Sequence, residues 1–239
     1  MKVYKNFITV CLISVLITGV ASGYENNSGG DTISVKSESV YYTSEDSVCS
    51  VSIIYPVLSG VKDKPVEEKV NTFLKIEFLD SPEWLDINNC DHEIGFTYES
   101  DYSIKYISLS FICIQQFIYE YSGGAHGNYG LYSFNIDLSN GELITLKEII
   151  LPDKFYSLSE IAVQTLLSDF DAETLVDAGL FEDTLSILPE QDFFITPGHL
   201  VLQFDPYEIA SYAMGEIQIK IPFEKIKELL KPELPFALK

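Results

Sequence analysis

A strand-length alternation of apolar and polar side chains, followed at once by a turn signal, constrains the fold of this chain most strongly. The alternation reads YGLYSFNIDL over residues 129–138, and Ser139, Asn140 and Gly141 come directly after it. Period-two alternation places the apolar side chains on one face of a β-strand, and Asn-Gly favours hairpins because both residues tolerate positive φ. We therefore predict a strand that turns at this point and returns over residues 142–145.

Segments of similar length and composition dominate the remainder of the chain. They either alternate or are apolar throughout, and they are rich in β-branched and aromatic residues, which favour strands. The further predicted strands are residues 31–43, 47–58, 93–102, 104–119, 193–195, 200–204 and 216–221.

Helical periodicity occurs in fewer places. In residues 63–79 apolar side chains recur on one stripe after Pro65, and residues 157–170 open with Ser157 and Glu160 at capping-box spacing. The helices lie between hairpins and do not follow every strand, so we predict an α+β fold with a largely antiparallel β-sheet and helices packed on one side. Two weaker helices are predicted at residues 171–181 and 222–230.

The first 23 residues have the pattern of a secretory signal peptide. Lys2 and Lys5 precede the apolar run FITVCLISVLITGV, and the small residues ASG follow at positions 21–23. The run is shorter than the ~20 residues of a membrane span, which favours cleavage and export over an uncleaved anchor. We therefore expect an extracytoplasmic protein, periplasmic or secreted, that has no membrane contact once the signal is removed.

The chain is strongly acidic, with a net charge of −21. Residues 1–23 contain two lysines and no acidic residue, so the remainder carries −23. A field of this sign repels nucleic acid and anionic lipid and attracts a cationic partner. Acidity of this kind also keeps an exported protein soluble without any partner.

Three cysteines follow the predicted signal, so a single disulfide would leave one thiol. Cys113 lies inside an apolar strand and is expected to be a buried thiol. Cys49 and Cys90 are then the predicted disulfide, since an exported chain meets an oxidising environment. Their spacing does not match a zinc motif.

Catalytic and metal-binding motifs do not occur. His92, His126 and His199 are each isolated, and the chain lacks HExxH, an EF-hand loop, G-x-S-x-G and the glycine motifs of nucleotide sites. We therefore predict no metal, no cofactor and no catalytic residue. The alternative is a glycan hydrolase that uses paired carboxylates, with Glu120, Asp137, Asp205 and Glu208 as the candidates.

The loop YSGGAH, residues 121–126, places a histidine beside two glycines. A catalytic or metal-binding histidine is one interpretation. Positive φ or a close backbone approach explains Gly123 and Gly124 better, and His126 is then expected to bond locally or to contact a partner.

Two segments resemble a bacterial extracytoplasmic domain family found in the outer domain of the anti-sigma factor RsiV and in the non-catalytic part of the peptidoglycan deacetylase PdaC. They are YSGGAHGNYGLYSFNIDLSNGELITLKEII, which carries the Tyr-Gly-Gly-Ala-His type of loop, and LVLQFDPYEIASYAMGEIQIKIPFEKI, with its F-x-P-Y-E-I-A-x-Y-A-x-G stretch. Residues 47–79, with the helix that contains Asn71, are similar to the preceding module of the same proteins. The resemblance implies residues 24–120 as a PdaC-like module and residues 121–239 as an RsiV-like module.

The resemblance also implies a role outside the membrane, since the RsiV domain senses lysozyme by binding it. Only six residues precede the apolar run, so we do not expect a sigma-binding domain, and the metal ligands of the deacetylase do not carry over. We predict an exported, non-catalytic binding protein of the cell envelope, whose partner is a basic protein such as lysozyme or a cell-wall glycan. The predicted contact residues are Gly123, Gly124, His126, Tyr129, Pro206, Tyr207 and Tyr212.

Overall fold

The computed structural model describes residues 32–80 and 93–238, which form two β-sheets and four α-helices. The larger sheet contains β1 (Ser34–Thr43), β2 (Cys49–Ser59), β3 (Phe96–Ile107), β4 (Phe111–Tyr121), β5 (Asn128–Asp137) and β6 (Glu142–Leu143). The smaller sheet contains β7 (Phe193–Thr196), β8 (His199–Phe204) and β9 (Ile217–Pro222). The helices are α1 (Lys64–Leu79), α2 (Leu146–Ile149), α3 (Phe155–Phe170) and α4 (Phe223–Ile226).

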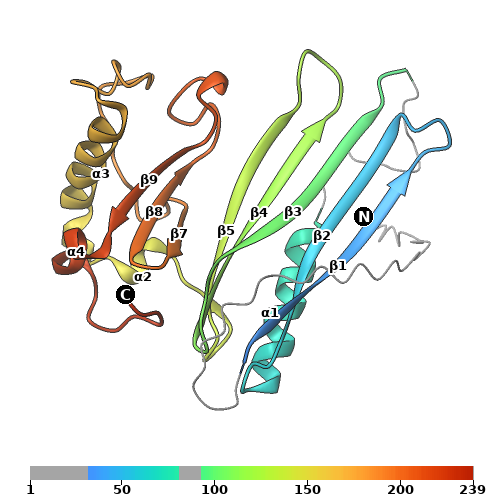
Figure 1. Ribbon diagram of the computed structural model, residues 1–239, viewed down its shortest axis with the longest axis horizontal. Helices are drawn as coiled ribbons and strands as arrows, with labels where there is room; N and C mark the ends of the chain where they lie inside the picture. Colours follow the sequence, from blue (N-terminus) through green and yellow to red (C-terminus); the bar gives the residue numbers. More distant parts are fainter. Residues whose placement is uncertain (1–31, 81–92, 239) are drawn as a thin grey trace, which may run out of the picture.

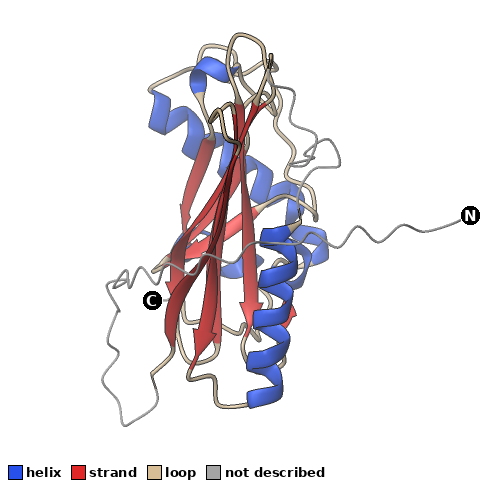
Figure 2. Ribbon diagram, turned by 90° about the vertical axis from the view of Figure 1, so that its right-hand side faces the viewer, coloured by secondary structure: helices blue, strands red, loops and turns tan. Residues whose placement is uncertain are grey.

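The strands of each sheet lie side by side in chain order, and the pairing is antiparallel with one exception (Figure 1). β2 and β3 run parallel, and α1 supplies the crossover that a parallel pair needs. The predicted α+β class with a largely antiparallel sheet is confirmed, although the strands divide between two sheets. α1 runs alongside the larger sheet (Figure 2), and α3 lies on the outer side of the smaller one (Figure 1), so each sheet has its long helix on one side.

β4 is covered on both faces, which explains its almost continuously apolar sequence. Ile112 and Ile114 belong to the apolar cluster beneath α1, whereas Phe111 and Cys113 belong to the cluster of the smaller sheet and α3. All four side chains are fully buried. The smaller sheet therefore packs against the face of the larger sheet that α1 leaves free.

Asn71 fastens α1 to the end of β2. Its side-chain oxygen accepts a hydrogen bond from the Leu58 N–H at 2.7 Å, and its side-chain nitrogen donates to the Leu58 carbonyl at 2.9 Å. The amide group of an asparagine can bind the N–H and the C=O of one residue in this way, so the pair of hydrogen bonds replaces a missing strand neighbour.

Replacing Asn71 by alanine is expected to lower the free energy of unfolding by about 2 kcal/mol, because two hydrogen bonds are lost and the Leu58 backbone is left unpaired. Asn71→Asp should not restore stability at neutral pH, since a carboxylate oxygen would then face the Leu58 carbonyl. Thr72→Ala, at an exposed position of the same helix, is the control and should stay within about 0.5 kcal/mol of wild type. Urea denaturation of the three variants tests this, and equal losses for Asn71→Ala and Thr72→Ala would contradict it.

The division predicted within residues 93–119 is wrong in position. β3 continues to Ile107, and the chain turns over residues 108–110, where the Ser108 N–H donates to the Phe111 carbonyl at 2.8 Å. Ser108, the exposed Leu109 and Ser110 continue the polar–apolar alternation of a strand, so the sequence pattern gave no sign of the turn. At the opposite turn only Gly141 has positive φ, and β6 ends at Leu143, two residues earlier than predicted.

Two helix predictions also need correction. α3 begins at Phe155, so Ser157 lies inside the helix and is not its cap. The capping box occurs in α2, where the Glu148 carboxylate accepts from the Thr145 N–H at 2.7 Å. Residues 171–181 form turns and no helix, because Asp171 ends α3 with a φ of +50°.

The cysteine prediction is confirmed in part. Cys113 is a free, fully buried thiol, and burial raises its pKa to about 12. Cys49 is buried and disulfide-bonded. Cys90 lies outside the described residues, so the pairing of these two cysteines stays a prediction.

The predicted signal peptide, residues 1–23, also lies outside the described residues. Within residues 32–80 and 93–238, no helix has the length and the apolar character that crossing a membrane requires.

Candidate functional site

Two loops that are far apart in the sequence meet at one end of the molecule. The first follows β4 and covers residues 122–127, and the second joins β8 to β9 over residues 205–216; both lie at the upper end in Figure 1. The Tyr212 hydroxyl donates a hydrogen bond to the Gly127 carbonyl at 3.0 Å, which ties the two loops together.

Tyr212 is the centre of an aromatic cluster. Its ring stacks on His126 with 4.4 Å between centroids, meets Tyr129 edge-on at 5.9 Å and lies 5.4 Å from Tyr207. Phe117 extends the group, 5.8 Å from Tyr129. We call His126, Tyr129, Tyr207, Tyr212 and Phe117 the aromatic cluster.

The cluster has a supported side and an exposed side. Tyr129 and Tyr212 are partly buried, whereas His126 is exposed and Tyr207 has 56% of its surface in solvent. Aromatic pairs contribute about 0.5–1.5 kcal/mol beyond their burial, so the inner rings hold the outer ones in place. The arrangement is a preformed surface that presents aromatic side chains to solvent.

Backbone geometry explains the glycines of the first loop. Gly123 and Gly124 have φ of +99° and +102°, which confirms the predicted positive φ. A Cβ atom on Gly127 would lie 2.5 Å from the end of the Tyr119 side chain, so any other residue here would require the Tyr119 ring to move. The Gly127 carbonyl accepts a hydrogen bond from His126 Nδ1 at 2.8 Å, which is a local bond to the next residue.

The surroundings of the cluster are acidic. The Tyr129 hydroxyl donates to Glu216 at 2.9 Å, and burial together with this hydrogen bond raises the Tyr129 pKa. Asp205 accepts from the Leu131 N–H at 3.0 Å, and its pKa is raised, chiefly by burial. Residues 155–219 contain twelve aspartates and glutamates and no lysine or arginine. Within this range the chain supplies no positive charge, although Lys105 of β3 acts on Glu216 through its charge.

The structure brings four of the seven predicted contact residues into ring contact. They are His126, Tyr129, Tyr207 and Tyr212, while Gly123 and Gly124 shape the first loop and Pro206 precedes Tyr207 without a ring contact. Sequence reasoning missed Phe117, Tyr119 and Glu216. The first two share a strand face with Tyr129, because Tyr119 pairs with Tyr129 in the β4–β5 register. Period-two alternation in β4 could have found them, but no local pattern marks Glu216.

The four candidate carboxylates do not all come together, although Asp205 and Glu208 are close enough for the charge of Glu208 to raise the pKa of Asp205. Asp137 accepts from the Ser139 N–H at 2.8 Å, and Glu208 accepts from the Asp205 N–H at 2.9 Å, so both serve turns. Glu120 and Asp137 pair with opposite ends of the β4–β5 ladder, about 30 Å apart at the rise of a strand. None of the four lines the cavity beside α3 or the one around Lys62 and Leu138. Among the described residues, no group of three histidine, cysteine or acidic side chains could hold a metal ion.

Two family descriptions match parts of the chain. "Deacetylase PdaC" matches residues 42–129, and "Protein of unknown function (DUF3298)" matches residues 147–224. The anti-sigma-V factor RsiV of Bacillus subtilis (strain 168) is 27% identical over 191 residues, which cover 77% of this chain and 66% of RsiV. The peptidoglycan-N-acetylmuramic acid deacetylase PdaC of the same strain is 32% identical over 139 residues, which cover 56% of this chain and 29% of PdaC.

Solved structures share the fold. A DUF3298 family protein from Bacteroides fragilis NCTC 9343 superposes with a TM-score of 0.70 at 18% identity, over 84% of this chain and 94% of that protein. A DUF3298 family protein from Pseudomonas aeruginosa PAO1 gives a TM-score of 0.63 at 18% identity, over 84% of this chain and 96% of that protein. Parts of the chain thus match a domain family that is shared with RsiV and PdaC. The function of this family is uncertain, and its occurrence in RsiV and PdaC links the chain to the cell envelope.

The aromatic cluster forms where the two family segments meet. His126 and Phe117 lie in the PdaC segment, Tyr207 and Tyr212 lie in the DUF3298 segment, and Tyr129 is the last residue of the first match. The cluster is therefore a joint product of both segments, which neither would form alone.

A polar seam lies deeper between the two sheets. We define it as Gln115 and Asn135 of the larger sheet with Gln203 of the smaller one and Asp192, which directly precedes β7. Asn135 donates to the Phe193 carbonyl at 2.8 Å, and Gln115 donates to Gln203 at 3.4 Å. Asn135 Oδ1 and Asp192 Oδ2 are buried and accept no hydrogen bond from the described residues.

Asp192 is the charged group of this seam. Burial raises its pKa from 3.8 to about 7, and the negative charges of Asp205 and Glu208 add to the shift. Hydrogen bonds from the Phe193 N–H, at 3.0 Å, and from Ser133 act in the opposite direction. The carboxyl group is thus held between the sheets with no cation to compensate its charge among the groups that act on its pKa.

Proposed function

We propose that this chain is an exported, non-catalytic binding protein of the cell envelope, and that the aromatic cluster contacts its partner. The observation that carries the proposal is the meeting of the loops 122–127 and 205–216 in one preformed surface with Tyr207 and His126 exposed. Exposed aromatic side chains on a rigid base are effective anchors in protein interfaces.

The charge distribution favours a basic protein as the partner. The chain has a net charge of −21, and residues 155–219, which supply two of the five residues of the cluster, contain acidic residues only among their charged groups. Such a field accelerates the encounter with a cationic protein and weakens as salt rises. Lysozyme is the basic protein that the resemblance to the outer domain of RsiV suggests, and a cell-wall glycan is the alternative ligand of the same surface.

Tyr207 combines exposure with an unusual backbone. Its φ of +71° lies in the left-handed region, where a bulky side chain costs about 1 kcal/mol relative to glycine. A strained residue that presents its ring to solvent, with 56% exposed, is typical of sites under a functional constraint. The strain therefore supports a role for this side chain in binding.

Tyr207→Gly is expected to weaken lysozyme binding at least about tenfold while leaving the free energy of unfolding within about 1 kcal/mol of wild type. The glycine relieves the backbone strain and offsets the lost contact with Tyr212. Binding is measured with the immobilised protein, without residues 1–23, at low and at physiological salt, and stability by urea denaturation.

Tyr41→Ala, at an exposed tyrosine of β1 outside the cluster, is the matched control and should bind as wild type does. If neither lysozyme nor peptidoglycan fragments bind to the immobilised protein at either salt concentration, the proposal is refuted. Equal losses in Tyr207→Gly and Tyr41→Ala would refute the assignment to the cluster.

A further inference from the structure

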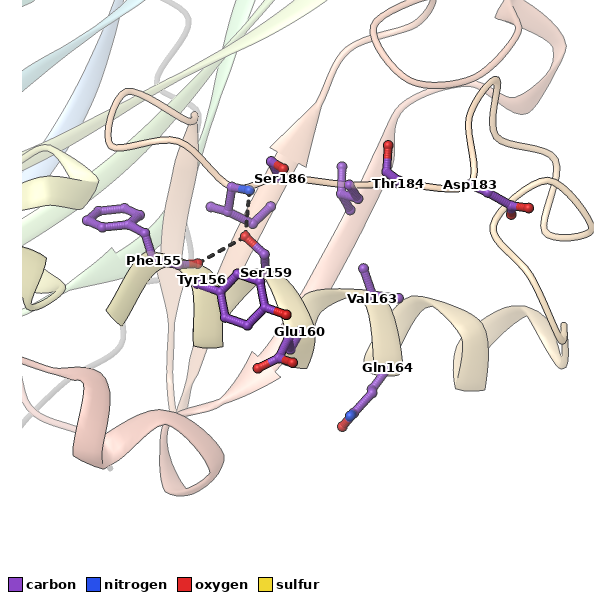
Figure 3. Close-up of a pocket in the computed structure, with 11 residues that line it drawn as sticks. Phe155, Tyr156, Ser159, Glu160, Val163, Gln164, Asp183, Thr184 and Ser186 are labelled. Atoms are coloured by element: carbon purple, nitrogen blue, oxygen red, sulfur yellow. Dashed lines mark hydrogen bonds between the residues drawn. The ribbon is translucent and has the colours of Figure 1, made fainter. Parts of the chain in front are cut away.

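A groove of about 510 Å³ runs between α3 and the chain segment 183–187 (Figure 3), and no residue of the aromatic cluster lines it. Its apolar lining includes Val163 of α3 and Leu185 of the segment, both packed on the core of the smaller sheet. Tyr156 forms part of the wall and is 75% exposed. The groove therefore has a fixed apolar base and an aromatic side chain at its rim.

Ser159 fixes the spacing between the two walls. Its hydroxyl accepts a hydrogen bond from the Ile187 N–H at 2.8 Å and donates to the Phe155 carbonyl at 2.9 Å (Figure 3). The segment is held beside the helix at this point and follows it without belonging to either sheet.

The backbone of the segment has unused hydrogen-bonding groups. Within the part of the chain that the structure describes, no residue bonds to the backbone N–H or carbonyl groups of Thr184, Leu185 and Ser186. Unpaired backbone of this kind is what an extended peptide recognises when it adds alongside a strand.

The charge of the groove selects the peptide. Glu160 and Asp183 belong to its lining, and it contains no lysine or arginine. The surrounding residues 155–219 do not supply a basic side chain either. An acidic or neutral peptide would gain nothing from these carboxylates, whereas a lysine or arginine would be attracted to them.

We propose that this groove binds an extended cationic peptide segment, which pairs with the backbone at Leu185, places an apolar side chain against Val163 and Tyr156, and directs a basic side chain to Glu160. This is a second binding surface, which stands independently of the aromatic cluster. Its occupant is an exposed segment of a protein in which basic and apolar residues alternate.

The probe is a fluorescein-labelled Lys-Val-Lys-Leu-Lys-Val-Lys peptide, and fluorescence anisotropy with the purified protein measures its binding. Saturable binding is expected, and the same peptide with glutamate in place of lysine should not bind. Glu160→Lys should weaken binding about fivefold to tenfold, because an attraction becomes a repulsion. Glu173→Lys changes the net charge equally at an exposed position outside the groove and should weaken binding less than about twofold.

Two further measurements locate the peptide. Methylation of the central leucine nitrogen of the probe should weaken binding about tenfold if the backbones pair. Tyr207→Gly should leave peptide binding unchanged, which separates this site from the aromatic cluster. Absence of saturable binding to wild type, equal losses in Glu160→Lys and Glu173→Lys, or full binding of the methylated probe would overturn the proposal.

Discussion

Asp192→Asn is expected to raise the free energy of unfolding at pH 8 by about 3 kcal/mol and to leave it almost unchanged at pH 4. The reason is the position of this carboxyl group between the two sheets, where burial raises its pKa from 3.8 to about 7. Asparagine has nearly the shape of the protonated acid and still accepts a hydrogen bond from the Phe193 N–H, but it never becomes charged.

The direction follows from proton binding. In the folded protein Asp192 keeps its proton up to a pH of about 7, whereas in the unfolded chain it loses the proton near its ordinary pKa of 3.8. The folded state therefore binds more protons between these values, and stability falls as pH rises through this window. The contribution is fully present below about pH 4 and lost above about pH 7. A shift of about three pKa units corresponds to about 4 kcal/mol at most.

The measurement is urea denaturation of wild type and variant at intervals from pH 4 to pH 8. Asp177→Asn removes one negative charge at an exposed turn and should follow the wild-type curve. Asp205, whose pKa is raised chiefly by burial, also acts on Asp192 through its charge, so its own titration adds to the slope in both proteins. The difference in the free energy of unfolding between wild type and Asp192→Asn therefore isolates the contribution of Asp192. If this difference is the same at every pH, the prediction is contradicted.

The parts of the fold that depend on local sequence could be predicted. Alternation and the Gly141 turn locate β5 and its return, and helical periodicity after Pro65 locates α1. Errors arose where a local signal was ambiguous. The exposed Leu109 between two serines continued an apparent strand through a turn, and the acidic residues after Asp171 resembled a helix although that residue takes a left-handed backbone.

Four of the five residues of the aromatic cluster could be named from the sequence, but their arrangement could not. Tyrosines and glycines in the two loops indicated contact surfaces, but only the packing of the smaller sheet on the larger one brings Tyr212 onto His126. The partnership of Glu216 with Tyr129 and the burial of Asp192 depend on the same packing. Contacts between distant segments produce no periodic pattern in the sequence. The seam and the groove beside α3 could therefore not be predicted from it.

Separating the predicted modules 24–120 and 121–239 is expected to abolish the folding of both, which is the largest effect we predict. β4 ends at Tyr121, so a cut after residue 120 falls just before the last residue of β4. It removes β5 from the larger sheet. The pairing of β4 with β5 extends from Phe111 to Glu120, and all of it is lost. The fragment 24–120 would expose a long apolar edge, which favours aggregation.

The fragment 121–239 loses its core in turn. Phe111 and Cys113, both fully buried, belong to the apolar cluster of the smaller sheet although they precede the cut. β5 would lose its neighbour β4 and with it the larger sheet. Asn135 would remain in the fragment, but Gln115, the other residue that the larger sheet contributes to the seam, would be missing. Removing two buried side chains of this kind costs several kcal/mol, on the order of the whole stability of a domain.

Circular dichroism and thermal unfolding of the separate fragments test this expectation. Neither should show a cooperative transition, whereas the intact protein should unfold in one step because both apolar clusters include β4. A fragment of residues 24–145 keeps β5 and β6 and should retain more strand, yet bind a hydrophobic dye through the uncovered Phe111 face. Cooperative unfolding of either 24–120 or 121–239 alone would show that the two family segments are independent domains, and the shared strand β4 would then be a contact between them and not their common core.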